Sequence, residues 1–192
     1  MAFHPADYGP ILSPLLDPER LPELGPGRPD PRIQGLLDAV TPDGAFAHAN
    51  LVDREMARAC LAGLWLHHDH LDRSHAVSQT IHSATGSYWH GVMHRREGDY
   101  PNAKYWFRRT GEHPVFPDLA RSAGRMTAGG GADTERLSSG ERWDPYAFVD
   151  LCRDCVSGRS GSEALCRRVQ RLEWELLFDF CYRRAAGIGI TS

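Results

Sequence analysis

The stretch EALCRRVQRLEWELLFDFCYRRAAG, residues 163–187, decides the fold class. Its large apolar residues recur at steps of four, three, four and four, at Leu165, Val169, Leu172, Leu176 and Phe180. This spacing places them on one face of an α-helix, and Gly187 is typical of a helix end. No part of the chain alternates convincingly between apolar and polar residues, as half-buried strands do. The sequence therefore predicts a mainly α-helical fold.

Outside this stretch the sequence predicts a proline-rich arm followed by a single helical domain. Eight prolines lie in residues 1–31, and proline interrupts helices, so residues 1–30 are expected to form an extended arm with short turns. The domain spans residues 31–192 and shows no internal repeat. Residues 122–142 contain three consecutive glycines and almost no large apolar residue. We expect them to form a mobile surface loop without core residues.

Residues typical of helix ends set the predicted boundaries within the domain. A short helix is expected over residues 31–40. Asn50 is a candidate N-cap for a long helix that ends near His70. The other boundary residues are Thr85 or Ser87 as the next N-cap, Pro101 and Gly111 at two ends of another helix, and Asp144 with Pro145 at a further start.

The composition argues against several classes of protein. The chain has 192 residues, 41% of them hydrophobic, and a net charge of -3, which indicates a globular domain rather than a protein that coats nucleic acid. No targeting segment and no apolar run of about 20 residues is apparent, so we expect no membrane partner. Five cysteines, an odd number, are expected to be reduced thiols in a cytoplasmic protein. Cys152 and Cys155 form an isolated C-x-x-C pair, which indicates buried thiols.

Histidines are concentrated in the stretch LHHDHLDRSHAVSQTIH, residues 66–82, which holds five of the ten. If residues 66–82 form one helix, a single face carries His68, Asp72, His75, Gln79 and His82. If the helix bends near Leu71, His68 diverges and the other four residues stay aligned. Only residues that share a face can act on a common ligand. This stripe is therefore a candidate site for a metal ion or for proton transfer.

A second face of the same kind follows, with His90, His94 and Glu97 at positions i, i+4 and i+7. Two histidines four apart on a helix can reach one metal ion, Zn or Fe being the ions expected here. Gly91 stands where the H-E-x-x-H motif has its glutamate, which argues against a metalloprotease. The candidate catalytic residues are Glu97, as general base, and His75. The candidate metal ligands, some three of which would bind one ion, are His68, Asp72, His75, His90 and His94.

Residues 88–109 combine basic and aromatic side chains within this acidic chain. Guanidinium groups bind carboxylate or phosphate, and aromatic rings stack on planar groups, so a small anionic substrate is expected. Adjacent residues project about 100° apart on a helix, so at most one of Arg95 and Arg96 joins His94. No nucleic-acid motif accompanies them. The candidate substrate-binding residues are Arg95, Arg96, Lys104, Arg108, Trp89 and Tyr105.

These observations favour a metal-dependent enzyme that acts on a small carboxylate or phosphate through a His/Asp site between two helices. One alternative is a helical binding or scaffold protein in which the histidines and carboxylates form a hydrogen-bonded polar layer. The basic residues would then pair with nearby acids and the aromatic rings would be core. Another is a metal-free hydrolase or lyase that uses a His–Asp pair as base. The sequence leaves the substrate, the reaction and the oligomeric state open.

Three segments carry a resemblance to known sequences: HLDRSHAVSQ, YWHGVMHRREGDYPNAKYWFRRTGEHP and WDPYAFVDLC. Together they resemble a family of uncharacterised conserved proteins of bacteria and fungi, over most of residues 60–180. The resemblance implies one intact domain. It implies no catalytic assignment.

Overall fold

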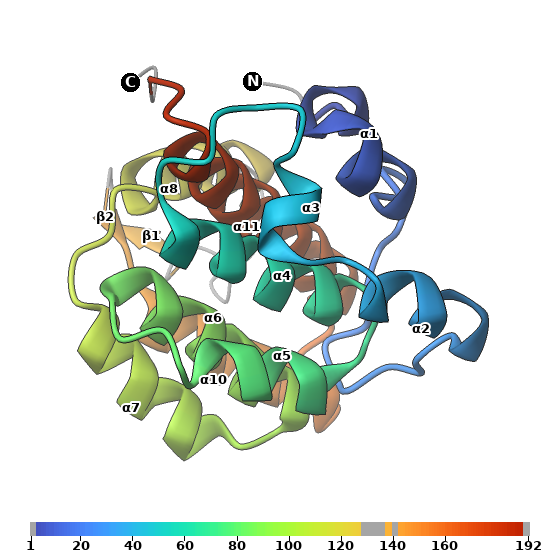
Figure 1. Cartoon of the computed structure of the whole chain (residues 1–192). Coiled ribbons are helices and arrows are strands. Elements are labelled where there is room, and N and C mark those ends of the chain that lie inside the picture. The colour runs from blue at the N-terminus through green and yellow to red at the C-terminus, as the bar shows by residue number, and fades with distance from the viewer. Residues whose placement is uncertain (1–2, 128–136, 140–141, 190–192) are drawn as a thin grey trace.

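The computed structural model describes residues 3–127, 137–139 and 142–189 of the chain, and the predicted mainly α-helical fold is confirmed. The chain begins with 3₁₀ turns and short helices and continues with longer helices that pack together. A two-stranded hairpin lies between α8 and α10 (Figure 1). In chain order they are η1 (Pro5–Tyr8), α1 (Gly9–Leu12), η2 (Ser13–Leu15), α2 (Pro31–Asp38), α3 (Pro42–Ala45), α4 (Arg54–His67), α5 (Leu71–Ser78), α6 (Ala84–Glu97), α7 (Tyr100–Thr110), α8 (Phe116–Thr127), β1 (Ser138–Ser139), β2 (Arg142–Trp143), α10 (Pro145–Val156) and α11 (Glu163–Ala185).

Helix α6 lies in the middle of the fold and is buried on all faces. Every residue from Thr85 to Arg96 is buried, which requires packing partners on every side. Helices α4, α5 and α7 pack directly against it, and α10 and α11 reach it through Phe148 and Glu173 (Figure 1). The segment that carries two of the candidate histidines is therefore enclosed by other helices on every side.

The described part of the proline-rich arm, residues 3–30, packs against the helices (Figure 1). Its irregular backbone leaves carbonyl groups without helical partners, and side chains of the domain donate to them. The Arg96 Nε group donates to the Gly25 carbonyl at 2.7 Å, and Gln170 donates to the Glu23 carbonyl at 3.0 Å. The buried apolar residues of the arm are Tyr8, Leu12, Leu15, Leu16 and Leu24. The arm thus contributes to the core.

The five stripe residues do not lie on one continuous helix over residues 66–82, because the chain breaks between α4 and α5, close to the expected helix end near His70. Helix α4 begins after its N-cap Asp53, rather than Asn50, and ends at His67. Asp69 then adopts a left-handed conformation with φ 63°, which an α-helix cannot contain. Its carboxylate accepts hydrogen bonds from Arg20 at 2.5 Å and Arg96 at 2.6 Å, and these two bonds hold the turn in place.

Other predicted boundaries are corrected or confirmed by side-chain caps. Ser83, rather than Thr85 or Ser87, caps α6 by accepting a hydrogen bond from the Gly86 amide. Asp144 caps α10 as predicted, with Pro145 at the first helical position. Gly111 ends α7 as predicted, with φ 62° in the region that favours glycine.

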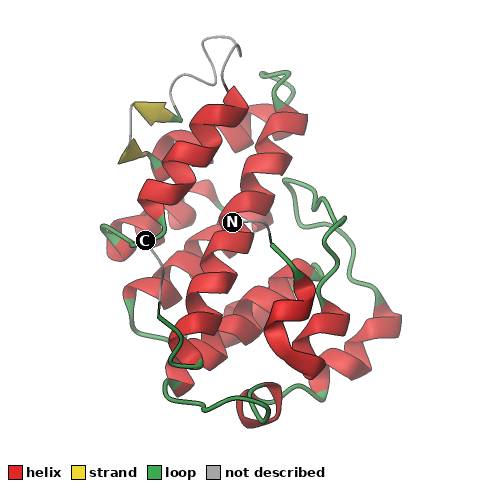
Figure 2. Cartoon of the chain, turned by 90° about the horizontal axis from the view of Figure 1, so that it is seen from above, coloured by secondary structure: helices red, strands yellow, loops and turns green. Residues whose placement is uncertain are grey.

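The expected surface loop over residues 122–142 is wrong for its first residues, because α8 continues to Thr127. Ala123 and Leu137 are fully buried, so core residues do lie in this segment. Strands β1 and β2 form a short antiparallel hairpin at one end of the molecule (Figure 2). The expectation of mobility for residues 128–136 and 140–141 concerns residues outside those described.

All five cysteines are free and buried, as expected for reduced thiols. Cys155 of α10 and Cys166 of α11 place their Sγ atoms 3.7 Å apart. Among the described helices, none combines the length and the apolar character needed to cross a lipid bilayer.

Candidate metal centre

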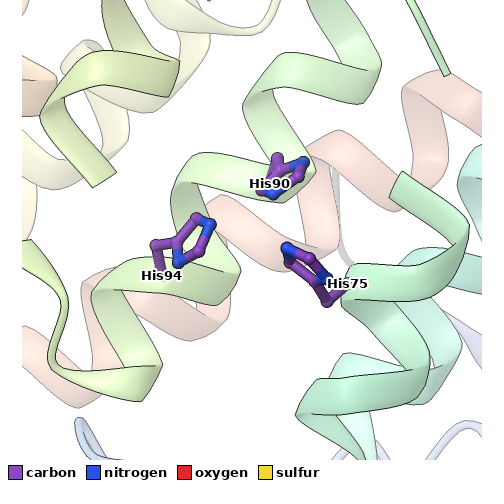
Figure 3. Close-up of side chains that lie close together, drawn as sticks. All are labelled: His75, His90 and His94. Atoms are coloured by element: carbon purple, nitrogen blue, oxygen red, sulfur yellow. The ribbon is translucent and has the colours of Figure 1, made fainter. Parts of the chain in front are cut away.

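Three imidazoles from two helices converge on one point. His75 projects from α5, and His90 and His94 project from α6 one turn apart (Figure 3). Residues 79–83 form the short connection that returns the chain, so α5 lies against α6. One ligand nitrogen from each ring can be chosen so that all three lie within 4.8 Å of one another.

The ring positions suit a shared ligand. The centroid of the His75 ring lies 4.6 Å from that of His90 and 5.4 Å from that of His94, and the two α6 rings are 4.8 Å apart. Nitrogens bound to one tetrahedral zinc ion at about 2.1 Å are about 3.4 Å apart. Small side-chain rotations would close the difference. The cluster could therefore hold a metal ion.

Two of the three imidazoles have no hydrogen-bond partner among the described residues. His90 is 2% exposed, and its Nδ1 atom is buried without a partner. His75 is half-buried and likewise makes no hydrogen bond to a described residue. A buried polar atom without a partner is costly, which makes a ligand between these rings physically reasonable.

The third imidazole, His94, is oriented from both sides. Its Nδ1 atom lies 3.0 Å from Glu97 Oε2, and its Nε2 atom lies 3.2 Å from Asn102 Nδ2. The carboxylate accepts a hydrogen bond from Nδ1–H, and the Nε2 lone pair accepts one from the Asn102 amide, which a metal ion at Nε2 would displace. A carboxylate behind a histidine is the usual outer partner of a metal-bound imidazole.

Burial keeps the α6 histidines neutral. Burial, with smaller effects of His94 and His75, lowers the pKa of His90 to about 3. Burial also lowers the pKa of His94, although the Glu97 carboxylate opposes this shift. Neutral imidazoles are the form that binds metal ions, so near neutral pH a metal ion displaces no proton from these two rings.

Helix α7 forms one wall of the cluster. The Trp106 ring stacks on His90 with centroids 3.9 Å apart and an interplanar angle of 13°. A Cβ atom at Gly91 would lie 3.2 Å from Phe107, so glycine permits this close approach of α7 to α6. This contact explains why Gly91 stands where a metalloprotease motif has glutamate. Sequence analysis missed Asn102 and Trp106, although their four-residue spacing places them on one face of α7.

The remaining candidates of the histidine stripe do not join the cluster: His68 precedes the break at Asp69, and those that follow it are exposed. The His68 Nε2 atom lies 2.8 Å from the Leu15 carbonyl of the arm. Of the five candidate ligands, His68 is therefore not among the three that converge. Asp72 is exposed and makes no hydrogen bond or ion pair with the described residues, so its predicted role as ligand has no support. Gln79 and His82 are also exposed.

The predicted substrate-binding residues do not form one pocket. Arg95 and Arg96 are buried and bind Glu173 and Asp69, and Lys104 binds Asp150, as the alternative interpretation expected. Ion pairing inside the chain removes these cations from ligand binding. Trp89 is buried in the core, while Arg108 and Tyr105 are exposed.

Comparisons of the chain with protein-family models, with curated proteins and with solved structures found no match. The resemblance described from the sequence and the cytoplasmic location therefore stay predictions. The candidate function depends on the geometry of the histidine cluster.

Proposed function

We propose that the chain binds a divalent metal ion through His75, His90 and His94 and is a metal-dependent enzyme acting on a small anionic substrate. The observation that carries the proposal is the convergence of three imidazole nitrogens within 4.8 Å. Two of these rings lack hydrogen-bond partners among the described residues, and the third has a carboxylate behind it. A set of this kind matches the inner and outer partners of known histidine metal sites.

Zinc is the ion that this donor set favours, with iron as the alternative. Three neutral imidazoles and one open position are a common environment for catalytic zinc. Non-haem iron enzymes commonly use two histidines and a carboxylate, whereas here the Glu97 carboxylate is bound to His94 Nδ1 and the converging group contains no carboxylate. A zinc ion would supply a Lewis acid and a bound water with a pKa of about 7.

Three residues around the ion would orient a ligand histidine, contact a bound ligand and exclude water. Glu97 would hold the tautomer of His94 that exposes its Nε2 lone pair, and this role replaces the general base predicted from sequence. Asn102 now donates to that lone pair at 3.2 Å, and its amide would lie beside a ligand bound to the ion. Trp106 would shield His90 from water by stacking on its ring.

One observation favours the rival function, a scaffold or binding protein with a structural polar layer. His94 is already satisfied by Glu97 and Asn102 and needs no ion. The same layer would leave the buried Nδ1 atom of His90 without a partner among the described residues, which is why we place it second.

Metal stoichiometry separates the two functions. Untagged protein is stripped with a chelator, incubated with Zn²⁺ or, without oxygen, with Fe²⁺, desalted and analysed for bound metal. About one equivalent is expected for the parent protein, and less than about a tenth for His90→Ala and His75→Ala. His82→Ala, a change of an exposed histidine in the adjoining connection, serves as the control and should retain the ion.

Absence of bound metal in the parent protein would overturn the metal site. Retention of metal by His90→Ala with unchanged affinity would do the same. The catalytic half of the proposal requires an exchangeable position on the ion. Azide should therefore change the visible spectrum of Co²⁺-loaded protein, and an unchanged spectrum would indicate a closed, structural site.

A further inference from the structure

One stripe of α7 lies along the histidine cluster. Asn102, Trp106 and Arg109 are spaced by four and three residues, so they share a face of this helix. Asn102 contacts His94 and Trp106 stacks on His90, which fixes the direction of that face. Arg109 continues the stripe by one further turn.

No described carboxylate pairs with Arg109 or with the adjacent Arg108, and of these two only Arg109 lies on the Trp106 ring. Its guanidinium carbon lies 5.5 Å from the centroid of the Trp106 ring, and the residue is exposed. Arg95, Arg96 and Lys104 each have an acidic partner. A guanidinium that is positioned by an aromatic ring and has no counter-ion retains its donors for a ligand.

The shared indole connects this cation to the cluster. Trp106 contacts the His90 ring at 3.9 Å and the Arg109 guanidinium at 5.5 Å. The side-chain amide of Asn102 adds a neutral hydrogen-bond donor at His94. The stripe thus carries an amide donor and an aromatic ring that contact two of the imidazoles, followed by a guanidinium that contacts the same aromatic ring.

We propose that Asn102, Trp106 and Arg109 form the recognition surface for an oxyanion, the carboxylate or phosphate group of a small substrate. This inference rests on the proposed function and names the residues that select its substrate. The anion binds at the open position of the metal ion. Arg109 pairs with its negative charge, Asn102 donates a hydrogen bond to it, and Trp106 positions the Arg109 guanidinium against the cluster.

Anion binding to Co²⁺-loaded protein tests this assignment. Acetate and inorganic phosphate are titrated separately, acetamide serves as the neutral comparison, and the dissociation constant is read from the visible spectrum. Arg109→Gln is expected to weaken binding of both anions about tenfold or more, because charge-assisted hydrogen bonds are lost. Arg109→Lys should give an intermediate loss, since it keeps the charge without the planar fork.

Two further variants control for charge and position. Arg125→Gln removes the same charge from an exposed position on α8 and should bind anions as the parent protein does. Arg108→Gln removes a positive charge at the adjacent position of α7. A loss of anion affinity equal to that of Arg109→Gln would overturn the assignment to Arg109. All these positions are exposed, so melting temperatures are expected to stay unchanged.

The results distinguish this inference from the function on which it rests. Protein that binds no Co²⁺ would overturn the proposed function and the inference together. Protein that binds Co²⁺ and anions, but with the same dissociation constants in Arg109→Gln, would overturn the inference alone. Equal binding of acetamide and acetate would also overturn it, because recognition would then not depend on negative charge.

Discussion

Arg95 and Glu173 form an ion pair in the middle of the fold, with Arg95 Nη2 2.5 Å from Glu173 Oε2 and both side chains 0% exposed. The Tyr88 hydroxyl donates to the other carboxylate oxygen at 3.2 Å, and the guanidinium lies 4.5 Å from the Phe148 ring centroid. The pair therefore joins α6 to α11 where neither charge can be solvated by water. Removal of one partner would leave the other charge buried and uncompensated.

We expect Glu173→Gln to lower the free energy of unfolding by about 3–5 kcal/mol, as measured by urea denaturation. Replacing both partners with apolar residues, Arg95→Met with Glu173→Leu, should recover most of the loss because no charge stays buried. Glu112→Gln removes one partner of the exposed pair with Arg142 and should have little effect. Similar losses for Glu112→Gln and Glu173→Gln would contradict this account.

His113 makes the stability of the fold depend on pH. The Val115 amide donates to His113 Nδ1 at 3.3 Å, so Nε2 carries the proton and donates to Thr85 Oγ1 at 3.2 Å. Burial lowers the pKa of His113 from 6.5 to about 4. The unfolded chain therefore binds a proton at a pH where the folded chain does not.

It follows that His113 makes its full contribution to the free energy of unfolding above pH 6.5. This contribution is lost as the pH falls toward 4. The expected slope is about 1.4 kcal/mol per pH unit, or roughly 3 kcal/mol over this interval. Urea denaturation of the parent protein and of His113→Asn between pH 8 and pH 4 checks it. The two curves should converge as the solution becomes acidic, and parallel curves would refute this role of His113.

Gly63 permits close contact between α4 and the Trp89 indole of α6. A Cβ atom at this position would lie 2.7 Å from a ring carbon of Trp89, which is fully buried. Gly63→Ala is therefore expected to lower the free energy of unfolding by about 1–3 kcal/mol through overpacking. Gly35→Ala in α2 meets no atom within 4 Å and should instead stabilise the protein by about 0.5–1 kcal/mol. Thermal unfolding of both variants measures whether each change lowers or raises the stability. A stabilising effect of Gly63→Ala would contradict the close contact with Trp89.

Glu97 is expected to set the metal affinity through His94 without binding the ion. Glu97→Gln keeps an acceptor near Nδ1 but removes its charge, and the dissociation constant for Zn²⁺ should rise about 10- to 100-fold. Asp72→Asn, a change of an exposed carboxylate on α5, should leave this constant unchanged. Competition with a chromophoric chelator measures both constants. A larger effect of Asp72→Asn would restore Asp72 as a ligand.

Local patterns predicted the helices well where the residues themselves carry the signal. The caps at Asp144 and Gly111 depend on nearby backbone groups and were correct. An end of the long helix near His70 and a bend near Leu71 were expected, but the cause of the break, the left-handed backbone of Asp69, was not, because Arg20 and Arg96, which hold it, are distant in the sequence. The spacing of residues within 66–82 cannot predict the contacts of Asp69 with these two arginines.

Helix α11 shows the same limit in its packing. Its existence followed from apolar spacing, but the predicted stripe is only partly buried at Leu165, Leu172, Leu176 and Phe180. The fully buried face is centred on Glu173 and Leu177. From the sequence alone, Glu173 would be assigned to the surface. Its pairing with Arg95 compensates the cost of removing its charge from water.

The sequence by itself determined the mainly helical fold and the pairing of His90 with His94, because both depend on spacing within one helix. Tertiary structure alone decided that His75, and neither His68 nor Asp72, completes the cluster. It also decided that Arg95 and Arg96 are internal ion-pair partners. The spacing of residues within a helix sets the direction in which a side chain projects from the helix axis. The residue that this side chain contacts depends on how distant segments pack together.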